Sequence, residues 1–204
     1  MSDARDWVVN RRSIALVAIV SMLVGACQST VVSSATVQAS SPASITPAAI
    51  DWAALARAVQ IPHLAPGAAC PRSSGRHVSA AYGIALGEGP VYPIGLADGV
   101  LSTYAVDGTY RQKVLWVSAA SYQGPVLIRG AQLDGSDVVQ FSTGDSGPTS
   151  EFRLLEPGAR SSNQEAGWRE WPSYTTVSRL GCYGYQVDGT SFSSVIVFEA
   201  RIGA

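Results

Sequence analysis

The side chains with the most distinctive chemistry in this 204-residue sequence are three cysteines, Cys27, Cys70 and Cys182. Cysteine thiols can bind zinc, pair as disulfides or carry a covalent modification. Zinc is not indicated, because no nearby cysteine or histidine completes a ligand set with zinc spacing. In an exported protein an odd number of cysteines calls for an explanation. The residues before Cys27 supply one.

The segment before Cys27 has the layout of an export signal. Arg11 and Arg12 form a basic start, and residues 14–26 are apolar or small apart from Ser21. This order of a basic start, a short apolar core and small residues at the end is typical of a signal peptide. The apolar stretch is shorter than the ~20 residues that a helix needs to cross a membrane. We therefore expect a cleaved signal and not a transmembrane anchor.

The end of this segment, Leu23-Val24-Gly25-Ala26-Cys27, resembles the lipobox of bacterial lipoproteins. The resemblance implies a diacylglyceryl thioether on the Cys27 sulfur, cleavage before Cys27 and acylation of the new amino group. Two or three acyl chains, at ~0.8 kcal/mol per buried CH₂, hold a protein stably at a membrane surface. The alternative is an ordinary secretory signal cut near Ala26, with Cys27 as a spare thiol.

Lipid on Cys27 would leave Cys70 and Cys182 as an even pair in an oxidising compartment. We therefore predict a disulfide between these two residues. It would tie the first residues of the folded domain to the penultimate strand. Closing a loop of that size contributes up to ~4.7 kcal/mol in the chain-entropy model.

A serine motif offers the clearest alternative chemistry. Residues 144–148, Gly-Asp-Ser-Gly-Pro, resemble the segment around the nucleophilic serine of trypsin-like proteases, with one glycine missing. Such a serine needs a histidine base and an acid to orient it. The sequence holds only His63 and His77, and neither lies in the Ala-Ala-His-Cys context of that family. We expect a polar turn here, and a serine hydrolase that uses Ser146 is the alternative function.

Acidic residues and overall charge indicate neither a metal nor a nucleic acid. Asp134, Asp137 and Asp145 would suit calcium if they met at one end of the domain, but their spacing matches no calcium loop, so solvated turns are expected. The formal net charge is −1, which argues against nucleic acid as a partner. No cofactor and no metal are predicted.

An aromatic segment at residues 167–174 is a possible ligand surface. Trp168, Trp171 and Tyr174 stand there beside charged residues. Exposed aromatic rings stack on sugars or anchor a protein partner. In the alternative interpretation the two tryptophans plug an open end of the domain, with Pro172 marking an edge strand.

The elements that position these residues change in character along the chain. Residues 27–45 are uncharged and rich in Ser, Thr, Ala and Val, as expected of a flexible tether. Thr46 as cap, Pro47 at the first position and Asp51 in the first turn predict a short helix, which apolar spacing extends to Val59. The predicted organisation is a signal peptide at 1–26, a lipidated tether at 27–45, a helix and connector at 46–69 and a β domain at 70–204.

From Cys70 onward the patterns are typical of β-structure. Residues 78–86 and 192–202 alternate in polarity, and 114–117 and 126–128 are short apolar runs. Four Asp-Gly pairs, at 98, 107, 134 and 188, indicate turns. Short strands at such intervals predict one antiparallel sandwich or barrel.

Residues 180–185 resemble the Gly-x-Tyr entry to the penultimate strand of immunoglobulin-like domains, although the cysteine here precedes the tyrosine. We therefore expect an all-β, antiparallel immunoglobulin-like sandwich. A jelly roll or small barrel is the alternative.

The region from about 46 to 204 resembles a group of uncharacterised bacterial lipoproteins. The likeness is carried by Cys70-Pro71, residues 124–130, Gly181-Cys182-Tyr183 and residues 195–198. It implies no particular activity. The expected protein is a non-enzymatic binding or structural module, lipid-anchored through Cys27 to the cell membrane or outer membrane and facing outside the cytoplasm. Its expected partner is an envelope protein or glycan.

Overall fold

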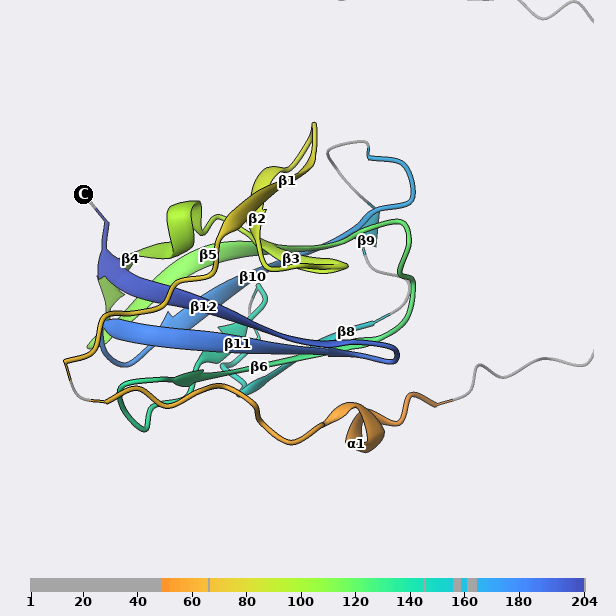
Figure 1. Ribbon diagram of the computed structural model, residues 1–204. Coiled ribbons are helices and arrows are strands. Elements are labelled where there is room, and N and C mark those ends of the chain that lie inside the picture. Colours follow the sequence, from red (N-terminus) through yellow and green to blue (C-terminus); the bar gives the residue numbers. More distant parts are fainter. Residues whose placement is uncertain (1–48, 66, 145, 156–158, 161–164, 204) are drawn as a thin grey trace, which may run out of the picture. The chain divides into compact units, whose positions relative to one another are not determined.

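The computed structural model describes residues 49–65, 67–144, 146–155, 159–160 and 165–203 (Figure 1). The predicted signal peptide, Cys27, the predicted tether and the predicted helix start at Thr46 and Pro47 lie outside these residues. Strands make up 52% and helices 4% of the described residues, so the predicted all-β class is confirmed.

The elements follow one another in the order α1 (Trp52–Leu55), β1 (Gly75–Ser79), β2 (Gly83–Leu86), β3 (Val91–Ile94), a 3-10 turn η1 (Ala97–Gly99), β4 (Val100–Val106), β5 (Thr109–Ser118), β6 (Val126–Gln132), β7 (Gln140–Ser142), β8 (Glu151–Leu154), β9 (Ala159–Arg160), β10 (Arg169–Val177), β11 (Gly181–Gly189) and β12 (Ser193–Ile202).

The larger sheet folds into two layers. Its strand order is β7-β10-β5-β4-β12-β11-β6-β8, with β3 also paired to β5 and β9 to β10. Strand β4 joins the layers, because its first half pairs in parallel with β12 and its second half pairs antiparallel with β5. At the opposite side, a bridge between Phe141 and Thr149 links β7 to the residues before β8. The fold is a sandwich that approaches a closed barrel.

Aromatic side chains fill the space between the layers. Trp116 on β5, Tyr185 on β11 and Phe198 on β12 are fully buried. The Tyr185 ring stacks on Phe198 with 4.4 Å between centroids and meets Trp116 edge-on at 5.1 Å. Side chains alternate across a strand. On each of these strands, the residues on either side of the buried aromatic residue therefore point away from the core. Those outward-facing residues also need cover where they are apolar.

Two separate segments cover the outer faces of the layers. The hairpin β1–β2 packs over β3 and β5, where Tyr82 and Ala85 meet Tyr92 and Val117. On the other layer, the chain between α1 and β1 runs over β6, β11 and β12 (Figure 1). Both faces of the sandwich are therefore partly buried.

The helix begins later than the sequence pattern predicts. Asp51, expected in the first turn, is the N-cap, and its Oδ1 accepts a hydrogen bond from Ala54 N at 3.0 Å. The helix ends at Leu55, so Ala58 and Val59 lie beyond it. The reason is tertiary, because the Ala58 carbonyl accepts a hydrogen bond from Gln186 on the sheet.

The alternating run at 78–86 is two strands and not the one predicted. Strand β1 ends at Ser79, and β2 begins at Gly83 with a φ of +65°. That left-handed conformation suits glycine and lets the chain reverse. Alternation continues through the turn in the sequence, which hides the break.

We predict a non-additive loss of stability when the hydrogen bond between the layers is cut. Thr175 Oγ1 and Tyr185 Oη lie 2.8 Å apart, and both residues are fully buried. Tyr185→Phe or Thr175→Val alone should lower the free energy of unfolding by about 1–3 kcal/mol, because each leaves a buried polar group without a partner. The double variant should lose less than the sum of the single losses. Urea unfolding of the four proteins measures this, and simple additivity would contradict it.

Candidate functional site

The segment that covers β6, β11 and β12, residues 49–65 and 67–74, is here called the strap. Its contacts fall along β11 in reverse order: Arg57 lies by Asp188, Gln60 by Gln186 and Cys70 by Cys182. The strap therefore runs antiparallel to β11 across the outer face of the sheet. It reaches this face mainly through side chains, not through a continuous backbone ladder.

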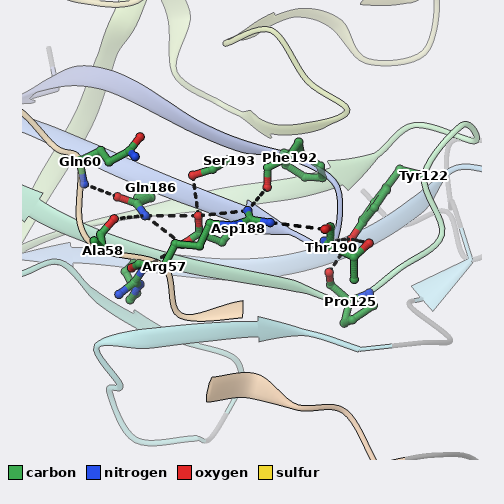
Figure 2. Close-up of polar contacts among 11 residues, drawn as sticks. Arg57, Ala58, Gln60, Tyr122, Pro125, Gln186, Asp188, Thr190, Phe192 and Ser193 are labelled. Carbon is green, nitrogen blue, oxygen red and sulfur yellow. Dashed lines mark hydrogen bonds and ion pairs between the residues drawn. The ribbon is translucent and has the colours of Figure 1, made fainter. Parts of the chain in front are cut away.

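A buried carboxylate lies under the N-terminal half of the strap. Asp188 has no exposed surface. Its Oδ1 accepts hydrogen bonds from Ser193 Oγ at 2.6 Å and Gln186 Nε2 at 3.2 Å, and its Oδ2 accepts from Arg129 Nη2 at 2.7 Å and Gln186 Nε2 at 3.0 Å. The Arg57 guanidinium adds a second cation, with Nη1 3.7 Å from Oδ1. We call these five residues the Asp188 cluster; Figure 2 labels Arg57, Gln186, Asp188 and Ser193.

The cluster holds the strap because several of its donors and acceptors also bind strap backbone. Gln186 Oε1 accepts from Gln60 N at 2.6 Å, and its Nε2 donates to the Ala58 carbonyl at 3.0 Å. Arg129 Nη2 donates to the Arg57 carbonyl at 2.5 Å. One buried side-chain amide thus pairs with the strap as a neighbouring strand would.

Arg57 extends the cluster to the turn between β11 and β12. Its guanidinium donates to the carbonyls of Phe192 and Thr190. The same turn is also held by Tyr122, whose Oη accepts from Thr190 N at 2.9 Å and donates to the Pro125 carbonyl at 2.7 Å (Figure 2). The turn, the β5–β6 loop and the strap therefore form one connected polar network.

A disulfide fastens the other end of the strap. Cys70 and Cys182 are bonded, with their Cα atoms 5.4 Å apart and 112 positions apart in the sequence. The predicted pairing is confirmed. Ile61, Leu133 and Val197 pack around the bridge as a small apolar cluster. The strap is thus held by charge at one end and by a covalent bond at the other.

Ser146 is held by a local turn. Its Oγ accepts a hydrogen bond from Thr143 N at 2.8 Å and lies 3.1 Å from Thr143 Oγ1. His63 lies on the strap and His77 on β1, and both are exposed. Among the residues that the structure describes, no hydrogen bond joins either histidine to Ser146. Turn chemistry accounts for Ser146, and the hydrolase stays a prediction without an observed base.

The aspartates considered for calcium have other contacts. Asp137 Oδ2 accepts from Ser178 Oγ at 2.5 Å and pairs with Arg179 at 3.6 Å, and Asp134 Oδ2 accepts from Cys182 N at 3.4 Å. Asp145 lies outside the described residues. In the described part of the chain, no three His, Cys, Asp or Glu side chains are grouped to hold a metal ion.

The three aromatic residues of the possible ligand surface do not share one surface. Trp168 is half-buried and stacks near Tyr82 and Tyr92, with centroids 5.1 and 6.3 Å away. Trp171 packs against the main core. Tyr174 points to the opposite side of β10 from Trp171 and lies on the outer face. The Arg111 guanidinium lies over its ring, 5.4 Å from the ring centroid. Ligand binding by this segment stays a prediction.

Two apolar depressions border the strap. One of about 420 Å³ is lined by Ile50, Leu55, Pro125 and Thr190, and one of about 230 Å³ is lined by Val59, Ile61, Ala131 and Val138. A third, of about 510 Å³, lies between the β1–β2 hairpin and the start of β12 and is lined largely by serine and glycine. All three are open to solvent, and none contains the Asp188 carboxylate.

Comparison with known proteins gives no relative: no protein-family model, no curated protein and no solved structure matches this chain. Among the described residues, no helix has the length and apolar character needed to cross a membrane. The Asp188 cluster and the Cys70–Cys182 bridge therefore have to be interpreted from their own geometry.

The Asp188 cluster was not predicted from the sequence. The Asp188-Gly189 pair indicated a turn, whereas Asp188 is a buried strand residue and the turn follows it. One signal was present: Gln186 and Asp188 alternate with Tyr185 and Val187, which places two polar residues on one face. The predicted Cys70–Cys182 bridge placed one strap residue on this face, but the sequence did not indicate that the residues before Cys70 extend over Gln186 and Asp188.

We predict that Arg129 contributes more to stability than Arg57. Arg129→Met should lower the free energy of unfolding by about 3–5 kcal/mol, because it removes the closest cation from a buried carboxylate. Arg57→Met should cost roughly 1 kcal/mol, since its side chain is 35% exposed and solvent screens the pair. Arg179→Met, whose side chain is 78% exposed, is the matched control. Urea unfolding tests the order, and equal losses for Arg129→Met and Arg179→Met would contradict it.

We also predict a loss of stability at alkaline pH. Burial raises the pKa of Tyr183 to about 12, and the charges of Asp137 and Asp134 add to the shift. A tyrosine in the unfolded chain has a pKa of about 10. Folding therefore favours the neutral form of Tyr183. The contribution of this group to the free energy of unfolding is complete below about pH 10 and is lost as the pH rises to about 12. Tyr183→Phe should flatten the curve of unfolding free energy against pH in that window, and Tyr104→Phe, the same change at an exposed side chain on β4, is the matched control. Identical curves for Tyr183→Phe and the parent would exclude this origin.

Proposed function

We propose that this protein is a membrane-anchored extracytoplasmic lipoprotein whose β-sandwich is a non-enzymatic binding or structural module. The observation that carries the proposal is the Cys70–Cys182 bridge. Stable disulfides belong to oxidising compartments outside the cytoplasm. With these two cysteines paired, Cys27 is the only cysteine left, and it stands in the segment that resembles a lipobox.

The arrangement of the strap supports an anchor on the N-terminal side. A lipid at Cys27 would hold the domain through residues 28–48 and then through the strap. The strap is fixed to the sheet by the Asp188 cluster and by the disulfide. Through the disulfide, a lipid at Cys27 would therefore be linked covalently to β11 as well as to the start of the β domain.

We further propose that the sandwich is immunoglobulin-like. Tyr183, at the start of the penultimate strand β11, donates its hydroxyl proton to the Arg179 carbonyl at 2.8 Å. A tyrosine near the start of the penultimate strand that bonds back to nearby backbone is the corner feature of immunoglobulin-like domains. The disulfide differs from the antibody type, because it joins β11 to the strap and does not join the two layers.

A partner, an envelope protein or glycan in this proposal, requires an exposed surface. Within residues 167–174, the contacts of Trp168 with Tyr82 and Tyr92 support a packing role. Pro172 is exposed and Tyr174 lies on the outer face of β10. A partner surface in this segment would therefore centre on Pro172 and Tyr174.

The anchor is tested by the mass of the N-terminal peptide of the mature protein. In a bacterial host, the parent should be cleaved before Cys27, carry the added mass of diacylglycerol on that residue and fractionate with membranes. Cys27→Ser should lose both the added mass and the membrane association, because its side chain offers no sulfur for the thioether. Ser29→Ala, two positions away, is the control and should behave as the parent. A parent peptide with an unmodified Cys27 thiol would refute the proposal.

A further inference from the structure

The strap is the only covalent route by which a pull from the N-terminal side can enter the sandwich. Such a pull reaches residue 49 first, then the contacts of Arg57 with Asp188, and only later the bridge at Cys70. Figure 1 shows this path, with α1 near the turn between β11 and β12 and the strap running from there along β6 and β11. The order of contacts along the chain is therefore also the order in which they would be loaded.

The contacts of the strap differ in strength along that order. After the contact of the Trp52 ring with the Arg153 guanidinium, the first cation of the Asp188 cluster to be loaded is Arg57, which is partly exposed and lies 3.7 Å from the carboxylate. Next come the two hydrogen bonds to Gln186, and then a backbone hydrogen bond from Leu64 N to the Leu133 carbonyl at 2.7 Å. The last is the covalent bond at Cys70. Because the strap reaches the sheet through a few side-chain hydrogen bonds and not through a continuous backbone ladder, few contacts resist its detachment before the bridge is reached.

The disulfide changes where tension goes next. Beyond Cys70, force crosses the bridge directly to Cys182 and bypasses the residues between them. Cys182 lies at the start of β11, and β11 is hydrogen-bonded on both sides, to β12 and to β6. Tension thus enters an interior strand of its layer, while most of the sandwich lies within the bypassed loop.

We propose that the strap is a yielding joint with a covalent stop. Under tension the strap detaches from its Asp188 end, lengthens the connection to the anchor and halts at the Cys70–Cys182 bridge, so the loop closed by the bridge stays folded. This inference rests on the proposed function, because lipid on Cys27 is what would fix the N-terminal end. The opposing end of the load is a partner bound to the sandwich.

Force spectroscopy on the unprocessed full chain tests the joint without any lipid. Cys27 is the one thiol outside the bridge, so a handle can be coupled to its sulfur, with the second handle at the C-terminus. In the oxidised protein a first, low-force event should release roughly 20 strap residues, or ~70 Å of contour length at ~3.5 Å per residue. Reduction should add the 112 residues of the closed loop, which corresponds to about 400 Å more.

Two variants assign the first event to the strap. Arg57→Met should lower the force of that event and leave later events unchanged, since it removes the partly exposed cation of the Asp188 cluster and its hydrogen bonds to the carbonyls of Phe192 and Thr190. Arg179→Met is a change of the same size at an exposed position outside the strap. It should alter neither the force of the first event nor the later events. Thiol alkylation under denaturing conditions confirms in each variant that the bridge has formed.

Three results would overturn the joint: one event in which strap and sandwich open together, a first event insensitive to Arg57→Met, or equal total extension with and without reductant. These results are independent of the lipid, because the chain used carries none. Failure of the proposed anchor appears in the mass of the N-terminal peptide and in membrane fractionation, and not in the force measurement. The two proposals can therefore fail separately.

Discussion

The burial of the Asp188 carboxylate determines much of the surrounding structure. A charge without solvent contact has to be met by hydrogen-bond donors and cations, because its hydration is lost. Here the donors are Arg129 on β6, Gln186 on β11 and Ser193 on β12, and Arg57 on the strap adds a second cation. Satisfying one carboxylate thus fixes the relative positions of three strands and a segment that belongs to no sheet.

The strap makes β11 a strand that is buried on both faces. Its inward residues Tyr183, Tyr185 and Val187 belong to the aromatic core, and its outward residues Gln186 and Asp188 are buried as well. Antiparallel sheets commonly leave one face to solvent, so the cover over this layer is a particular feature of the fold. It uses polar contacts at one end and apolar contacts with the disulfide at the other.

The second outer face is covered by different means. The β1–β2 hairpin lays Tyr82 over Tyr92 and Val117, and the Tyr82 hydroxyl donates to Glu170 Oε1 at 2.7 Å. Trp168 completes this aromatic group. The chain before β3 therefore covers both layers in turn, first one with the strap and then the other with the hairpin, before it enters the main sheet.

Local patterns in the sequence predicted what depends on near neighbours. Alternation predicted β-structure, and the Asp-Gly pairs at 98 and 107 form turns in which both residues have positive φ. The odd number of cysteines, combined with the lipobox resemblance, predicted the Cys70–Cys182 pair. Only tertiary structure decided which faces meet. Residues 78–86 form a hairpin and not one strand, and the helix spans only Trp52–Leu55. Asp188 was predicted in a turn but is a buried strand residue. The reason is that a sequence pattern reports which residues share a face, whereas burial depends on the distant segment that covers that face.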